Sequence, residues 1–198
     1  DPTEIGRLAG IYNVTELATA VKPLLLRHLL DRHQCPVIYL DPDIRIYDSL
    51  EPLGELAATH GIVLTPHTTS PYPQDDRDID AFCVRAVGVY NLGFIAVGPS
   101  AGPFLDWWWQ RTRREALVDV PKMMFTDQRW VDFVPSFFDH HILKDPGYNV
   151  AYWNVLGREV RAQGDRYLVN GEPLKFFHFS GFDSRRSWLL SKHQGVRP

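Results

Sequence analysis

The chain has 198 residues, enough for one domain with a substantial core, and 44% of them are hydrophobic, which is ordinary for a globular protein. Its 24 acidic and 21 basic residues give a formal net charge of -3. This balance argues against nucleic acid as a partner, because neutralising phosphates requires clustered Lys and Arg. No apolar run approaches the ~20 residues of a membrane-spanning helix, and no signal-peptide pattern is visible, so we expect no transmembrane segment.

Cys35 and Cys83 are the two cysteines of the sequence. They are far apart and have no metal-ligand spacing, and two lone thiols fit a reducing cytosol better than a disulfide framework. A single disulfide between them remains an alternative. The predicted location is therefore cytoplasmic, either free or peripheral to a membrane.

The first forty residues predict helices followed by a short buried strand. Residues 12–33 carry apolar side chains at helical spacing, and Pro23 inside this stretch predicts a break there. Residues 37–40, Val-Ile-Tyr-Leu, have the β-branched and aromatic character of an interior strand. That strand is expected to end abruptly at Asp41-Pro42-Asp43.

The same alternation continues along the chain. We expect helices over 50–60 and 102–114 and interior strands over 61–65 and 90–97, with a surface loop rich in Pro, Asp, Thr and Ser over 68–80. Strands that alternate with helices are typical of an α/β sandwich with a mainly parallel central sheet.

The last third of the chain predicts short antiparallel strands. These strands span 150–153, 166–169 and 175–179 and are separated by turns such as Asn170-Gly171. No internal repeat or second domain is evident, so we expect a single domain over 1–198.

Asp41 and Asp43 carry the clearest chemical signal. In open α/β sheets ligands bind at the carboxyl ends of strands, which is where these acids follow residues 37–40. Two adjacent carboxylates repel each other unless a cation lies between them, and a hard divalent ion is the simple remedy. The alternatives are a solvated turn and a phosphatase-type nucleophile motif, which Ile44-Arg45 fits poorly.

His178 is the second candidate ligand. It follows Phe176-Phe177 in an apolar strand, where a lone histidine is often only a hydrogen-bonded structural residue. Gly181 beyond it allows a bound group to approach the backbone, and Arg185 could supply the planar fork that suits phosphate.

These motifs, in this order, resemble those of GT-A-fold glycosyltransferases. The likeness is to the retaining family 8, which includes lipooligosaccharide galactosyltransferases and glycogenin, and it spans about residues 12–188. The segments that carry it are Ile38-Tyr39-Leu40-Asp41-Pro42-Asp43, Tyr90-Asn91-Leu92-Gly93-Phe94, Thr126-Asp127-Gln128 and His178-Phe179-Ser180-Gly181.

The resemblance implies a metal centre and a catalytic pair. Asp41 and Asp43 match the metal-binding Asp-x-Asp of the family, and His178 matches its third protein ligand, with Mn²⁺ (or Mg²⁺) as the ion. Asp127 and Gln128 match the acid–amide pair beneath the transferred sugar. The alternative for Asp127 is an ordinary helix cap.

The resemblance also implies a donor site. Asn91 and Gly93 match a segment that lines the donor sugar pocket, where Leu92 replaces the usual Ala, and the alternative is a plain turn between strands. Gly181 matches the glycine beside the diphosphate. The family often has Lys-Pro-Trp after that glycine, whereas Ser184-Arg185-Arg186-Ser187-Trp188 stands here. Either Arg185 or Arg186 could replace the Lys as the phosphate contact.

Two further residues are weaker candidates. Lys22 lies where related chains place a basic residue near the donor, and a solvated lysine is the alternative. His67 follows a predicted strand end and is a candidate for the acceptor side.

The resemblance predicts that the chain is an N-terminally truncated GT-A-like catalytic domain. Family members place a base-binding strand well ahead of the Asp-x-Asp, whereas only 40 residues precede Asp41. The predicted function is transfer of a sugar from a nucleotide-sugar, a UDP-sugar by resemblance, to a carbohydrate or other hydroxyl acceptor. The rivals are a sugar nucleotidyltransferase or phosphotransferase, and a carbohydrate-binding module without turnover.

Overall fold

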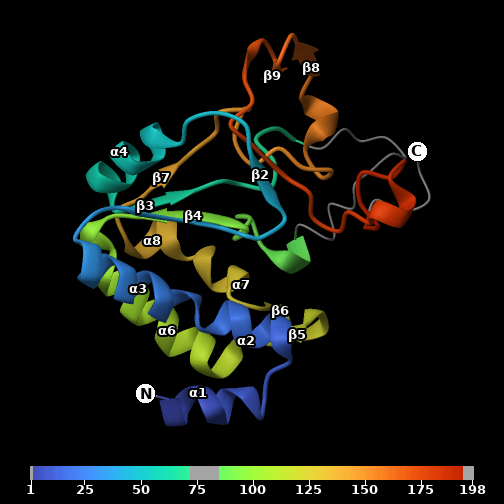
Figure 1. The fold of residues 1–198 in the computed structure, drawn as a ribbon. Helices are drawn as coiled ribbons and strands as arrows, with labels where there is room; N and C mark the ends of the chain where they lie inside the picture. The colour runs from blue at the N-terminus through green and yellow to red at the C-terminus, as the bar shows by residue number, and fades with distance from the viewer. Residues whose placement is uncertain (1, 72–84, 194–198) are drawn as a thin grey trace.

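A mixed β-sheet forms the centre of the molecule, with helices on both of its faces (Figure 1). The computed structural model describes residues 2–71 and 85–193. Helix α4 (Glu51–His60) covers one face of the sheet, and α3 (Lys22–His33) and α6 (Gly102–Glu115) lie on the other (Figure 1). No helix of these residues is long and apolar enough to cross a bilayer.

The predicted helical break near Pro23 is confirmed. Helix α1 (Pro2–Ala9) is followed by α2 (Val14–Ala20), and α3 begins at Lys22 with Pro23 in its first turn. Proline is tolerated there because the first turn of a helix leaves its N–H groups unpaired in any case.

The central sheet has the strand order β1-β4-β3-β7. Its strands are β1 (Val37–Leu40), β4 (Phe94–Val97), β3 (Ile62–Leu64) and β7 (His141–Ile142). Strand β4 runs antiparallel to both β1 and β3, and only the β3–β7 pair is parallel.

The expectation of a mainly parallel sheet is therefore wrong, because the sheet is mixed and mostly antiparallel. Strands β3 and β4 are buried at every position, and a strand covered on both faces is a continuous apolar run in either direction. The direction of β4 depends on how the chain returns from β3, and the hydrophobic pattern does not record that path.

The core lies on both faces of β3 and β4. On the side of α3 and α6, Leu26 and Phe104 pack with the fully buried Trp108. On the side of α4, Leu53 packs against Phe94. The four residues of β1, at one edge of the sheet within the described part of the chain, are only half-buried.

The expected antiparallel character of the C-terminal part is confirmed. Strands β8 (Val160–Gln163), β9 (Arg166–Val169) and β10 (Glu172–Pro173) form an antiparallel meander. The turn at Asn170-Gly171 has positive φ at both residues, 53° and 90°, which a tight hairpin requires and which Asn and Gly tolerate.

One predicted strand, over 150–153, is wrong. Only Val150 bridges to Phe177 there. The backbone then turns, because the Asn154 side chain accepts a hydrogen bond from the Ala151 N–H at 2.9 Å. An Asn side chain can satisfy the backbone locally and so compete with a β-ladder.

The remaining α-helices and β-strands of the described residues are short. They are β2 (Ile44–Ile46), β5 (Val118–Asp119), β6 (Met124–Phe125), α7 (Gln128–Val131), α8 (Val134–Phe137) and β11 (Phe176–His178). Of the predicted loop over 68–80, residues 72–80 lie outside the described part of the chain.

Candidate functional site

The two aspartates lie on a tight turn directly after β1. Ile44 N donates to Asp41 O at 3.0 Å, so the chain reverses through Pro42 and Asp43. Proline fits the second position of such a turn because its φ is preset. After this turn the chain continues as β2 rather than into solvent.

Strand pairing brings His178 to the aspartates. Strand β2 runs antiparallel to β11, with Ile44 opposite His178, and Phe179 N donates to Asp43 O at 2.9 Å. The imidazole is 4% exposed, and its Nε2 lies 3.1 Å from Asp43 Oδ1. Two segments far apart in the sequence thus meet at the end of β1.

Asp41, Asp43 and His178 form a group that could hold a metal ion. One ligand atom from each lies within 4.8 Å of the others. Two carboxylate oxygens with one imidazole nitrogen fit a divalent ion, since carboxylates suit Mg²⁺ and Mn²⁺ and imidazole suits transition metals. The hydrogen bond with His178 holds the pKa of Asp43 below its usual range, and partial burial opposes this.

Tyr39 supports Asp41 and was not recognised from the sequence as a site residue. Its hydroxyl donates to Asp41 Oδ1 at 2.7 Å. Burial raises the pKa of Tyr39, and the bond to Asp41 raises it further, so the hydroxyl remains a donor. The missed signal was the i, i+2 spacing, because alternate residues of a strand share a face.

Asn91 and Gly93 lie directly against His178. Asn91 Oδ1 is 3.2 Å from His178 Nδ1. A Cβ on Gly93 would lie 2.2 Å from His178 Cε1, so only glycine leaves room for the ring at this position. The segment is no exposed turn, because Asn91, Leu92 and Gly93 are all buried.

His67 lies in the interior, 5% exposed, rather than on an open acceptor face. Its Nε2 is 3.3 Å from Asn91 Nδ2, and its Nδ1 is 3.2 Å from Val89 O. Burial lowers the pKa of His67 to about 4, so its ring is neutral near pH 7. The Trp153 ring packs in a T-shaped arrangement against the rings of both His67 and His178, and Trp153 was not predicted as a site residue.

Lys22 is buried, which overturns the alternative that it is a solvated lysine. Both its side chain and that of Asp127 are 2% exposed, and Lys22 Nζ lies 2.8 Å from Asp127 Oδ2. The ammonium also donates to Leu92 O at 2.8 Å and lies over the Tyr39 ring. Burial raises the pKa of Asp127 above its usual range, and the charge of Lys22 opposes this only in part.

Asp127 and Gln128 begin helix α7, but neither acts as a side-chain cap. Asp127 occupies the N-cap position without a capping hydrogen bond. Gln128 Oε1 accepts from Leu92 N, and Gln128 Nε2 donates to Val87 O, both at 2.8 Å. Gln128 therefore ties α7 to the segment that precedes β4.

A cavity of about 530 Å³ opens beside Asp43. Its lining includes Arg45, Phe179, Gly181 and Phe182. Gly181 has φ +73°, and a Cβ there would lie 2.4 Å from His193 Cδ2, so conformation and packing both require glycine. The two aromatic residues that line this cavity, Phe179 and Phe182, were not predicted as site residues.

Arg185 does not line this cavity. Its side chain is 88% exposed, and Nε lies 3.1 Å from Asp183 Oδ1. The structure thus brings Gly181 to the metal group's cavity but leaves Arg185 at the surface.

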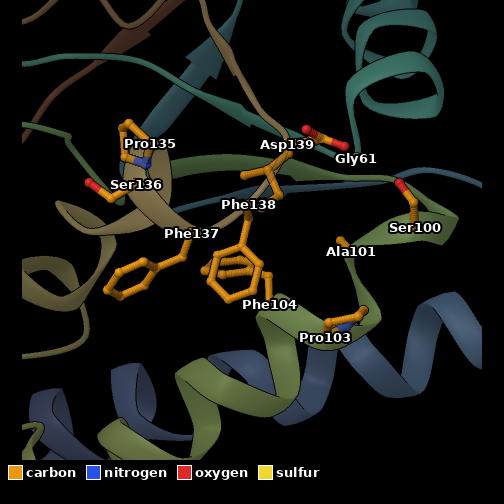
Figure 2. Close-up of a pocket in the computed structure, with 11 residues that line it drawn as sticks. Gly61, Ser100, Ala101, Pro103, Phe104, Pro135, Ser136, Phe137, Phe138 and Asp139 are labelled. Carbon is orange, nitrogen blue, oxygen red and sulfur yellow. The ribbon is translucent and has the colours of Figure 1, made fainter.

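A second cavity, of about 520 Å³, lies where β3 begins (Figure 2). Figure 2 shows Phe104 and Phe138 close together in it, with Ser100 and Asp139 nearby. None of the predicted site residues lines this cavity.

Comparison with known proteins supports a glycosyltransferase-like fold. A crystal structure of a glycosyltransferase involved in the glycosylation of the major capsid of PBCV-1 matches 91% of this chain and 78% of its own, with a TM-score of 0.56 and 12% identity. At that identity the likeness concerns the fold alone.

Two proteins of Bacillus subtilis (strain 168) are similar in sequence. The uncharacterized protein YfnD is 27% identical over 174 residues, and the uncharacterized protein YfnF is 27% identical over 183 residues. These regions cover 84% and 89% of this chain but only 54% and 60% of the relatives. The chain therefore spans little more than half the length of these relatives. No family model matches the sequence.

Proposed function

We propose that this chain is the catalytic part of a glycosyltransferase that moves a hexosyl group from a nucleotide-sugar to a hydroxyl acceptor. The observation that carries the proposal is the convergence of Asp41, Asp43 and His178 within a glycosyltransferase-like fold. A UDP-sugar donor, a carbohydrate acceptor and retention of anomeric configuration are parts of the proposal that rest on the motif resemblance.

Asp41, Asp43 and His178 would hold Mn²⁺ or Mg²⁺. Such an ion, when bound, supplies positive charge that stabilises the leaving diphosphate. The aspartates serve this role because their carboxylates are partly exposed at the turn after β1, whereas the imidazole reaches them from the buried side.

The cavity beside Asp43 is the proposed place of the donor diphosphate. Gly181 supports this assignment, because it lines the cavity and matches the glycine that the motif resemblance places beside the diphosphate. Arg185 would add a charge-assisted hydrogen bond to phosphate. To do so its guanidinium would have to exchange Asp183 for the ligand.

The proposed sugar site lies over the buried residues behind the metal group. Lys22, Asn91 and Gly93 are its proposed donor-side residues, and Asp127 and Gln128 would lie beneath the transferred sugar. The ion pair with Lys22 favours an ionised Asp127 despite its burial. An anionic carboxylate there would stabilise positive charge that develops at the anomeric carbon.

We propose further that 1–198 is one catalytic domain completed by a base-binding strand from the rest of the protein. Strand β1 supports this, since its apolar residues are half-buried at the sheet edge while those of β3 and β4 are fully buried. An apolar edge strand normally pairs or is covered. The greater length of the YfnD and YfnF proteins is consistent with further segments.

The proposal is tested by donor hydrolysis. UDP release from UDP-hexoses with Mn²⁺ would be measured for the full-length protein, for Asp43→Ala and for Asp48→Ala. Asp48 is the matched control, because it is a nearby exposed acid paired with Lys175. Loss of an outer-shell partner already costs about 10–100-fold, so Asp43→Ala is expected to lose at least that much, with Asp48→Ala near wild type.

The other outcomes identify the rivals. Sugar binding without UDP release, unaffected by metal, would indicate a binding module. Formation of UTP and a sugar 1-phosphate when pyrophosphate is added would indicate a nucleotidyltransferase, and release of UMP with transfer of the sugar phosphate would indicate a phosphotransferase. Either result would contradict the proposal of a glycosyltransferase.

A further inference from the structure

Asn91 is the centre of a buried polar network behind His178. Asn91 is 8% exposed. Its Oδ1 accepts from Gly93 N at 3.2 Å and from Asn149 Nδ2 at 3.1 Å, and lies 3.2 Å from His178 Nδ1. Its Nδ2 lies 3.3 Å from His67 Nε2. Every polar atom of the amide therefore has a partner inside the protein.

The partners determine which way the amide points. The backbone N–H of Gly93 can only donate, so the atom beside it must be the oxygen of Asn91. That same oxygen faces His178 Nδ1, which must therefore carry a hydrogen to make the bond. On the other side, the amide nitrogen donates to His67 Nε2, and His67 Nδ1–H donates to Val89 O.

Neighbouring residues also fix the orientation of the His178 ring. Gly93 closes one side, since a Cβ there would lie 2.7 Å from His178 Nδ1. The Trp153 ring meets the imidazole edge to face, with centroids 5.2 Å apart. Nε2, on the opposite side of the ring from Asn91, faces Asp43 and donates a hydrogen to its carboxylate when no ion is bound; a bound cation would take the place of that hydrogen.

We propose that Asn91 is a positioning residue for His178: it keeps the hydrogen on Nδ1, so that Nε2 presents its lone pair to the cation held with Asp41 and Asp43. The inference rests on the proposed metal centre. His67 and Asn149 act through Asn91, because they hold the amide in the orientation that accepts from His178. Ligating histidines depend on such partners for ring orientation and basicity.

This role differs from the donor contact that the motif resemblance implies for Asn91. The Asn91 oxygen already faces three hydrogen-bond donors, and one of its two amide hydrogens points to His67 Nε2, so at most one amide hydrogen is left for a sugar hydroxyl. The two roles predict different effects. A donor contact changes sugar affinity, whereas a positioning residue changes metal affinity in the absence of any donor.

The test measures Mn²⁺ binding to the 198-residue chain without a nucleotide-sugar. The amount of free Mn²⁺ would be followed by electron paramagnetic resonance for wild type, Asn91→Leu, Asn91→Asp and Thr112→Val. Thr112 is the matched control. It is fully buried and its hydroxyl donates to Ala20 O at 2.9 Å, so its replacement also removes an internal hydrogen bond, and none of its hydrogen bonds among the described residues involves Asn91, His67, Asn149 or His178.

Asn91→Leu is expected to weaken Mn²⁺ binding by about 10–100-fold. Asn91→Asp keeps an acceptor for Nδ1–H and is expected to bind Mn²⁺ at least as tightly as wild type, and Thr112→Val is expected to bind it unchanged. Imidazole ¹⁵N spectra with diamagnetic Zn²⁺ give a second readout. The Nδ1 hydrogen of His178 should be visible in wild type and Asn91→Asp but exchange rapidly with water in Asn91→Leu.

The outcomes separate this inference from the proposed function. If wild type binds Mn²⁺ and Asn91→Leu binds it equally well, the inference is overturned and the metal centre stands. If wild type binds no divalent ion, the proposed metal centre fails and the inference fails with it. Should Asn91→Leu not fold, Asn91→Asp decides, because weakened Mn²⁺ binding in that variant contradicts the positioning role.

Discussion

The imidazole of His178 rests on the backbone of Gly93, and this contact shows how little freedom a single residue has in the candidate site. The backbone of Gly93 does not have a positive φ, so glycine is required there for steric reasons. A Cβ at this position would clash with both Cε1 and Nδ1 of the His178 ring. Protein interiors are packed closely enough that one added methyl group is felt.

We therefore expect Gly93→Ala to displace His178. Overpacking of this kind costs about 1–3 kcal/mol, and the displaced ring should bind Mn²⁺ more weakly. Thermal unfolding and Mn²⁺ titration measure the two effects. Gly54→Ala is the control, since a Cβ there meets nothing within 4 Å. Because Gly54 lies in the middle of helix α4, this variant should leave Mn²⁺ binding unchanged and stabilise the fold by up to about 1 kcal/mol. Full Mn²⁺ affinity in Gly93→Ala would contradict the steric argument.

At the scale of elements, the site is assembled by two long-range connections. The β2–β11 pairing carries His178 to Asp43. The ion pair between Lys22 and Asp127 joins the first turn of α3 to the start of α7. Both connections depend on partners that are far apart in the sequence.

Lys22→Met should destabilise the fold strongly. Removing one partner of a buried ion pair leaves the other charge uncompensated, at a cost of about 3–5 kcal/mol. The double variant Lys22→Met/Asp127→Asn removes that charge and should recover part of the loss. Urea unfolding measures each free energy. Lys175→Met, which breaks the more exposed pair with Asp48, should change stability little, and an equal loss in both single variants would argue against a special role for the buried pair.

At the scale of the whole molecule, the candidate metal group joins distant parts of the chain. Asp41 and Asp43 follow the edge strand β1, whereas His178 belongs to the C-terminal strands. A ligand that needs all three binds only the folded chain, and so it should stabilise the fold as a whole.

Mn²⁺ should therefore raise the free energy of unfolding of the wild-type chain. The expected gain is about 2.7 kcal/mol when free Mn²⁺ is 100 times its dissociation constant. Asp43→Asn should abolish the gain, and Asp48→Asn should retain it. Urea unfolding with and without Mn²⁺ measures the difference, and an equal gain in Asp43→Asn would show that the ion binds elsewhere.

The sequence by itself determined the features that depend on near neighbours along the chain. The helix break at Pro23, the strand that ends at Asp41, and the hairpin at Asn170-Gly171 were predicted because proline, apolar runs and Asn-Gly turns act over a few residues. Part of the candidate metal group was predictable for the same reason, since two of its carboxylates follow one strand end.

Tertiary structure alone decided the direction of β4, the burial of Lys22 and the contact between Asn91 and His67. A buried strand has the same composition in either direction. A lysine is predicted to be solvated unless the fold places a carboxylate beside it, as it places Asp127 beside Lys22. These three features depend on which distant segments of the chain pack together. Many long-range contacts together determine that packing, and no local sequence pattern predicts it.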